Sequence, residues 1–307
     1  MQKMKKTDEL VKMLQDGVRE IQDSDNYRKY LKIMSSFPEY SSRNTLLIFQ
    51  QCPNASYVAG YQTWKNRYGR QVRKGEKAIR ILAPYTYKPA AVDADEANEM
   101  RTGFRKISVF DISQTDGKPL PELIEPDSLN QDVTHYQELF DGIRSAAGFE
   151  MIFDDMESGR KGACRYWDQT IRIQKDMPQL QTIKTMVHET AHSILHDPYL
   201  SEESEFQNFV LENATIREIE AESVAFVVCS HFGLDCSEYS FPYVAGWKQQ
   251  SEFFEESLSR IQKTADHMIT EIRKHLPESS AWMDAEQLSQ IGSRYLIPHS
   301  GCSMIRF

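Results

Sequence analysis

Apolar residues recur at helical spacing through the first fifty residues of the chain. A stripe of five such residues predicts an amphipathic helix over residues 7–22. A second helix is predicted over 27–35. A third begins near Ser41 and ends before Pro53, because proline cannot continue a helix. The stripe consists of Leu10, Val11, Leu14, Val18 and Ile21.

Alternation with a period of two replaces this pattern after residue 56. It predicts a strand over 78–82, with a partner strand over 104–112 and a short β-prone segment at 57–61. The acidic residues 92–99 between the two strands are expected to form an exposed insertion. Proline and glycine gather between Asp116 and Pro126, which predicts a linker between two domains, 1–118 and 128–307.

The second half mixes helical and strand patterns. We expect a helix over 134–147, a meander of strands at 150–153, 163–167 and 170–174, and a helix capped by Asp176 and ended by Asp197-Pro198. Residues 201–213 read as acidic and irregular. Further helices are expected at 213–232, within 243–276 and near 284–291. The predicted fold class is α+β, with a small α+β N-terminal domain before a second α+β domain.

Charge divides the chain in the same way. Residues 1–90 carry 17 Lys and Arg against 8 Asp and Glu, and residues 91–307 carry 19 against 37. A basic half favours a polyanionic partner, although a solvated basic face would look the same. No run reaches the roughly 18 to 20 apolar residues of a membrane span. The five scattered cysteines and the lack of an apolar leader predict a cytoplasmic protein with no membrane partner.

The clearest chemical motif is Val187-His188-Glu189-Thr190-Ala191-His192. On a helix, His188 and His192 lie one turn apart on one face, where two imidazoles can hold one zinc ion. Glu189 then lies beside the open coordination position and is the candidate general base.

A catalytic zinc site needs a third protein ligand, and the helix predicted at 213–232 offers Glu218, Glu220 and Glu222. Glu220 shares an apolar row with Ile216 and Val224, and a buried carboxylate needs a cation. We therefore predict Glu220 as the third ligand and expect Glu218 and Glu222 to be solvated charges.

The N-terminal half interleaves aromatic and basic residues, as sequence-tolerant binding of single strands requires. The aromatic candidates can stack on bases and the basic ones can contact phosphates, although Tyr61 and Trp64 also suit a core. The candidates for DNA binding are Tyr61, Trp64, Arg67, Tyr68, Arg70, Arg73, Lys74, Lys77 and Arg80.

These motifs resemble those of ArdC-type antirestriction proteins. The N-terminal match runs from Tyr40-Ser41-Ser42-Arg43-Asn44 through Lys74-Gly75-Glu76-Lys77 to Gln114-Thr115. The C-terminal match comprises residues 185–196, 218–226 and 243–247, and it is similar to ImmA/IrrE-type peptidases. The resemblance implies an ssDNA-binding domain followed by a zincin-like, gluzincin-like metallopeptidase. It also implies Glu220 as third ligand and a place on mobile elements.

The sequence thus predicts a single-stranded-DNA-binding zinc metallopeptidase of antirestriction type. In this protein, Glu189 would be the general base that activates a zinc-bound water, and that water would hydrolyse a peptide bond in a protein substrate. One alternative is a DNA-binding protein whose zinc site is structural or catalytically silent. Another is a regulatory protease that cleaves a repressor.

Overall fold

The computed structural model of the chain describes residues 8–87, 100–118, 133–157, 159–199, 204–239, 241 and 251–277. Helices and small sheets are mixed along the chain, which confirms the predicted α+β class. Every helix in these ranges is too short or too polar to cross a bilayer. The predicted insertion at 92–99, most of the linker and the helix near 284–291 lie outside the described residues.

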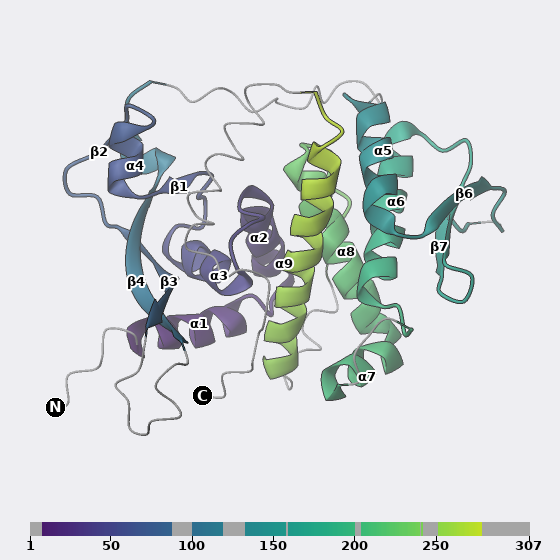
Figure 1. Ribbon diagram of the computed structural model, residues 1–307, viewed down its shortest axis with the longest axis horizontal. Helices are drawn as coiled ribbons and strands as arrows, with labels where there is room; N and C mark the ends of the chain where they lie inside the picture. The colour runs from purple at the N-terminus through teal and green to yellow at the C-terminus, as the bar shows by residue number, and fades with distance from the viewer. Residues whose placement is uncertain are drawn as a thin grey trace.

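Three helices and a long hairpin make up the N-terminal half (Figure 1). The helices α1 (Asp8–Glu20), α2 (Ser24–Ser36) and α3 (Ser42–Gln51) agree with the sequence prediction. The antiparallel hairpin of β3 (Ile79–Tyr87) and β4 (Arg101–Asp111) is longer than predicted. The smaller elements are β1 (Val58–Ala59), α4 (Tyr61–Asn66), β2 (Gln71–Val72), a 3-10 turn (Ile112–Gln114) and β5 (Thr115–Asp116).

Two amide side chains of α3 cover the free edge of β3. Asn44 donates to the carbonyl of Leu82 and accepts its N–H, both at 2.9 Å. Gln51 makes the same pair of bonds with Arg80, at 2.9 and 2.8 Å. The backbone groups on this strand edge are therefore hydrogen-bonded to side chains, and Asn44 is a buried hydrogen-bonding residue.

The second half packs a three-stranded sheet against one side of a group of four helices (Figure 1). The helices at its centre are α5 (Tyr136–Ala147), α6 (Gln179–Leu195), α8 (Ala214–His231) and α9 (Ser251–Arg273). A short helix, α7 (Glu205–Glu212), occupies residues predicted to be irregular. Asp176 does not cap α6, because its backbone is left-handed (φ 59°) and Pro178 occupies the N-cap position.

The sheet is not the predicted meander. Its strands β6 (Glu150–Asp154), β7 (Gly162–Arg165) and β8 (Thr170–Gln174) follow the order β6-β8-β7. β8 pairs in parallel with β6 and antiparallel with β7. Ile171 and Ile173 of β8 are fully buried, which explains why this strand takes the centre and leaves β7 at an edge.

The two halves share one hydrophobic core. Helix α2 packs against α8, and the hydroxyl of Tyr27 lies 2.9 Å from that of Ser223. Arg28 donates to the carbonyl of Cys236 at 3.0 Å. In Figure 1, α2 and α3 lie against α8 and α9 in the middle of the molecule, so the helix that faces the histidine motif also contacts the N-terminal half.

Candidate metal centre

Helix α6 carries the histidine motif and is enclosed on most sides by α5, α8 and the strands β7 and β8. Its position explains why twelve of its residues are buried, polar ones included. His192 is 7% exposed and Glu189 8%, while His188 is half-buried. As predicted, the three residues lie on one helix, with the histidines one turn apart.

The two imidazoles converge on Glu218 of α8. The Nε2 atoms of His188 and His192 lie 3.1 Å apart, and each is 3.5 Å from a carboxylate oxygen of Glu218. One ligand atom from each residue fits within 4.8 Å of the others. Two nitrogens bound to a tetrahedral zinc ion lie about 3.3 Å apart, so this donor set fits a divalent metal.

Glu222 supports His188 from behind. Its carboxylate lies 3.1 Å from Nδ1 of His188, so that Nδ1–H can donate to it and leave Nε2 free for a metal. Burial opposes the charge on His188, but hydrogen bonds to Glu218 and Glu222 outweigh burial and raise the pKa of His188 to about 10. The same histidines hold the pKa of Glu218 well below its usual range. The carboxylates of Glu218 and Glu222 therefore favour a positive charge at this site, as a metal ion would supply.

Glu220 is buried, as its row predicted, but it faces another part of α6. Its carboxylate accepts hydrogen bonds from Nε2 of His196 at 2.9 Å and from the hydroxyl of Ser257 at 2.7 Å. The structure thus brings Glu218, rather than Glu220, to the two predicted histidine ligands. Burial lowers the pKa of His196 to about 4, although the bond to Glu220 acts in the opposite direction.

Glu189 lies under the edge strand β7. A Cβ atom on Gly162 would come within 2.7 Å of its Oε1, so only glycine leaves room for this carboxylate. Burial raises the pKa of Glu189, while the charges of His188 and His192 lower it. A carboxylate with a raised pKa beside a metal site suits a general base.

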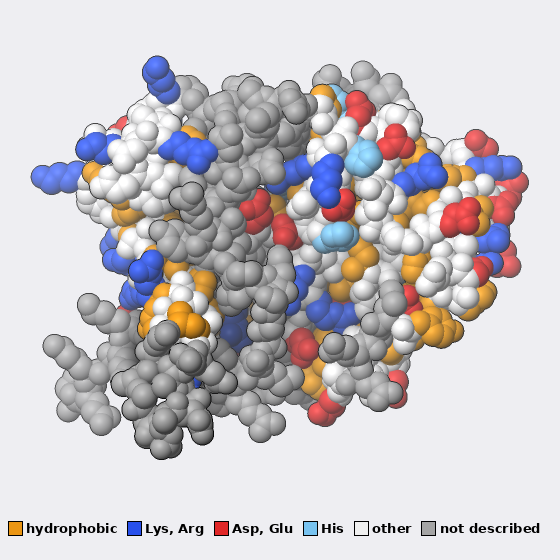
Figure 2. Space-filling model, in the orientation of Figure 1, with side chains coloured by type: hydrophobic (Ala, Val, Ile, Leu, Met, Phe, Trp, Pro, Cys, Tyr) orange, Lys and Arg blue, Asp and Glu red, His pale blue; other side chains and the backbone are white. Residues whose placement is uncertain are grey.

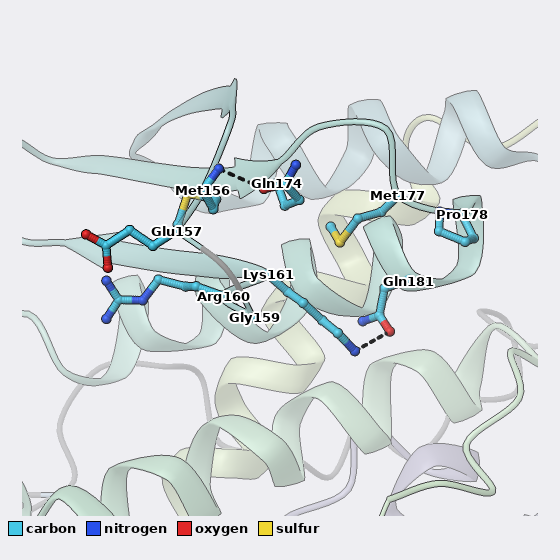
Figure 3. A pocket seen from close by; sticks show the side chains of 9 residues that line it. All are labelled: Met156, Glu157, Gly159, Arg160, Lys161, Gln174, Met177, Pro178 and Gln181. Atoms are coloured by element: carbon cyan, nitrogen blue, oxygen red, sulfur yellow. Dashed lines mark hydrogen bonds between the residues drawn. The ribbon is translucent and has the colours of Figure 1, made fainter.

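A pocket opens between the segment that joins β6 to β7, the end of β8 and the start of α6 (Figure 3). Met156 and Met177 give it an apolar side, and Lys161 and Gln181 give it a polar one, joined by a 2.7 Å hydrogen bond. Gln181 also donates to the hydroxyl of Thr185 at 3.2 Å, one turn before Glu189. Gln181, Thr185 and Glu189 follow one another at a spacing of one turn, so the pocket and Glu189 lie along the same face of α6.

The predicted DNA-binding residues separate into buried and exposed groups. Trp64 is fully buried, and its indole donates to the carbonyl of Phe110 at 2.8 Å. Arg70 is buried against Thr115, to which its guanidinium donates at 2.8 and 3.0 Å. Both therefore stabilise the fold. Tyr68 is half-buried, and the exposed candidates are Tyr61, Arg67, Arg73, Lys74, Lys77 and Arg80.

The far half of the β3–β4 hairpin carries aromatic residues that the sequence analysis did not single out. Tyr85, Tyr87 and Phe104 are each more than 40% exposed, and the first two rings lie 5.7 Å apart. Exposed Arg101 and Arg105 lie on the same face of the hairpin as the two tyrosines, since Tyr87 pairs with Arg101. Figure 2 shows Lys and Arg side chains gathered over this end of the molecule beside an orange patch.

Residues 2–111 match the family described as the N-terminal domain of anti-restriction factor ArdC. An uncharacterised protein of Bacillus anthracis is 29% identical over 310 residues, which cover 87% of this chain and 51% of that protein. The chain therefore spans about half the length of this curated relative.

Two crystal structures of the antirestriction protein ArdC from plasmid R388 match the chain. The metal-free structure has a TM-score of 0.53 and 22% identity over 76% of this chain and 86% of that chain. The Mn(II)-bound structure has a TM-score of 0.48 and 19% identity over 76% and 85%. Residues 2–111 therefore belong to the family of ArdC N-terminal domains, and the chain shares its fold with the metal-free ArdC structure.

Proposed function

We propose that this protein is a metal-dependent peptidase whose ion, zinc, is held by His188, His192 and Glu218. The observation that carries the proposal is the convergence of both Nε2 atoms and the Glu218 carboxylate beside Glu189. A divalent ion bound there would supply a Lewis acid that acidifies water and polarises a peptide carbonyl. With such an ion bound, Glu189 would accept a proton from the water as its oxygen adds to the carbonyl carbon. It would return this proton to the amine nitrogen as the C–N bond breaks.

The surroundings suit a peptide substrate. Among the described residues β7 is the edge strand of its sheet, and it lies beside Glu189, so an extended chain could pair with it there. The pocket lined by Met156 and Met177 includes Gln181, which lies two turns before Glu189 on α6, and it could take an apolar substrate side chain.

The test combines metal content with hydrolysis. Purified wild-type protein should contain about one zinc per chain and cleave an unfolded protein such as casein. Glu189→Gln should keep the zinc and lose hydrolysis by at least about 100-fold, since it keeps the side-chain shape but cannot take a proton. Hydrolysis that persists in Glu189→Gln would exclude Glu189 as the base.

Two other outcomes correspond to the rival functions. Zinc without hydrolysis of any substrate would indicate a structural or silent site. Proteomics of cells with wild-type and Glu189→Gln protein would show whether a single repressor-like substrate is lost.

A second proposed activity is binding of single-stranded DNA by the N-terminal half. Tyr85 and Tyr87 offer adjacent exposed rings to bases, with Arg101 and Arg105 on the same face for phosphates. This surface replaces the buried Trp64 and Arg70 in our proposal. Affinity for a single strand should fall steeply with rising salt, and a flat salt dependence would exclude phosphate contacts.

The cellular role that we propose is protection of incoming mobile DNA in the cytoplasm. It rests on the ArdC family match. Transfer of an unmodified plasmid into a restricting host should rise when the wild-type chain is present. An equal transfer with and without the chain would argue against this role.

A further inference from the structure

A chain of three buried hydrogen bonds leads from Ser257 on α9 to His192 on α6. Ser257 lies 2.7 Å from Oε1 of Glu220, and Oε2 of Glu220 lies 2.9 Å from Nε2 of His196. Nδ1 of His196 then lies 3.0 Å from Nδ1 of His192. His192 is 7% exposed, and the other three residues are at most 2% exposed.

Donor and acceptor roles along this chain follow from its buried end. A carboxylate only accepts, so Ser257 and Nε2–H of His196 both donate to Glu220. Nδ1 of a neutral His196 then carries a lone pair, which accepts Nδ1–H of His192. His192 is thereby left with a lone pair on Nε2, the atom that faces His188 and Glu218.

We propose that His196, oriented by Glu220, is a positioning residue that fixes the metal-binding tautomer of His192. This inference rests on the proposed metal site. Glu222 does the same for His188 by direct contact at 3.1 Å, whereas Glu220 acts on His192 through a second imidazole. The three glutamates of α8 thus have different roles. Glu218 is a metal ligand, whereas Glu220 and Glu222 each orient one of the two histidine ligands.

The environment of Glu220 supports this role. Both of its oxygens already accept a hydrogen bond, and Arg260 lies 3.8 Å from Oε2. A buried carboxylate is stable only with such partners. Turning Glu220 toward the metal would break both hydrogen bonds, so Glu220 acts by orienting His196 rather than as a ligand.

The first experiment measures zinc affinity in two variants at residue 196. His196→Phe keeps a ring but offers no acceptor, whereas the amide oxygen of His196→Asn can occupy the place of Nδ1. We expect the zinc dissociation constant to rise about 10- to 100-fold in His196→Phe and distinctly less in His196→Asn. His267→Phe, on the exposed face of α9, is the matched control and should bind like wild type.

Unchanged zinc affinity in folded His196→Phe would overturn the proposal. So would an equal loss in His196→Phe and His196→Asn, because both lose the bond to Glu220 and only the acceptor differs. Circular dichroism of each variant checks that its helices are intact. If His196→Phe does not fold, His196→Asn against wild type still tests the rescue.

The second experiment reads the tautomer directly in metal-free protein. Proton–nitrogen NMR correlations of the imidazoles should show His192 protonated on Nδ1 and unprotonated on Nε2 in wild type. A proton on Nε2 would overturn the proposal. Because this measurement uses no metal and no substrate, it remains decisive if wild-type protein binds no zinc, a result that would remove only the proposed peptidase function.

Discussion

Gly162 on β7 and Glu189 on α6 approach so closely that no larger residue fits at position 162. A Cβ atom there would lie 2.7 Å from Oε1 of Glu189, 2.8 Å from its Cγ and 2.7 Å from Cγ2 of Thr185. The glycine therefore sets the distance between the edge strand and the carboxylate that we propose as the base.

Gly162→Ala should separate hydrolysis from metal binding. The added methyl group has to displace Glu189 or β7, so we expect peptidase activity to fall by at least about 10-fold, since misplacement by about 1 Å can cost 100-fold. Zinc content should stay at the wild-type level, because the three atoms nearest to the new methyl group belong to Glu189 and Thr185, which are not ligands. Gly60→Ala is the control, since its new Cβ would meet only Thr63 at 3.7 Å. Full activity in Gly162→Ala would show that Glu189 does not need this position.

Replacing glutamates of α8 one at a time identifies the third ligand. Glu218→Ala should lose most of the bound zinc, because it removes the carboxylate 3.5 Å from both histidines. Glu220→Gln should retain zinc at saturating metal, since an amide can still bond to His196 and Ser257. Glu212→Ala, at an exposed position of α7, is the control and should keep its zinc. Zinc loss in Glu220→Gln with retention in Glu218→Ala would instead make Glu220 the ligand.

The contrast between Glu218 and Glu220 shows what helical periodicity can predict. The apolar row of α8 correctly indicated that Glu220 is buried. It could not indicate which element lies opposite each face, and α6 presents His196 to one face and His188 to another. The spacing of Glu218 and Glu222, one turn apart like the two histidines, was the available signal for a shared face.

The fold shows the same limit. Helices α1 to α3 were predicted because their apolar stripes are local properties of the sequence. The position of β8 between β6 and β7 depends on contacts between distant residues, which alternation does not specify. The sequence did not predict α7, because acidic residues dominate the composition of this segment. Its apolar residues Phe206 and Val210 are buried only through packing against α8 and α9.

The hairpin surface can be tested through its tyrosines. Tyr85→Ala and Tyr87→Ala should each weaken binding of a single strand, since stacking on one aromatic ring contributes about 1–3 kcal/mol. The salt dependence should stay the same, because neither change removes a charge. Tyr199→Ala is the matched control, since that ring is 69% exposed in the other half of the chain. Wild-type affinity in both hairpin variants would place DNA binding elsewhere.

His231 provides a test of how the two halves are joined. Its Nδ1 lies 2.7 Å from the carbonyl of Ser35 on α2, and its Nε2 lies 2.9 Å from the guanidinium of Arg273 on α9. Since Arg273 only donates, His231 must be neutral and donate through Nδ1. Burial, and then the positive charges of Arg273 and Lys32, lower the pKa of His231 from 6.5 to about 3.

The low pKa of His231 makes the stability of the folded chain depend on pH. Between pH 6.5 and about 3 the unfolded chain binds a proton that the folded chain rejects, so stability is complete above pH 6.5 and falls as the solution becomes acidic. We expect the free energy of unfolding of wild type to lose up to about 1.4 kcal/mol more per pH unit than that of His231→Asn. Urea unfolding at several pH values, in chelator to remove any metal, measures both slopes.

Asparagine at 231 can still donate to Ser35 but does not titrate, and His267→Asn on the surface is the control. Equal slopes in wild type and His231→Asn would show that this histidine is not held neutral between the two halves.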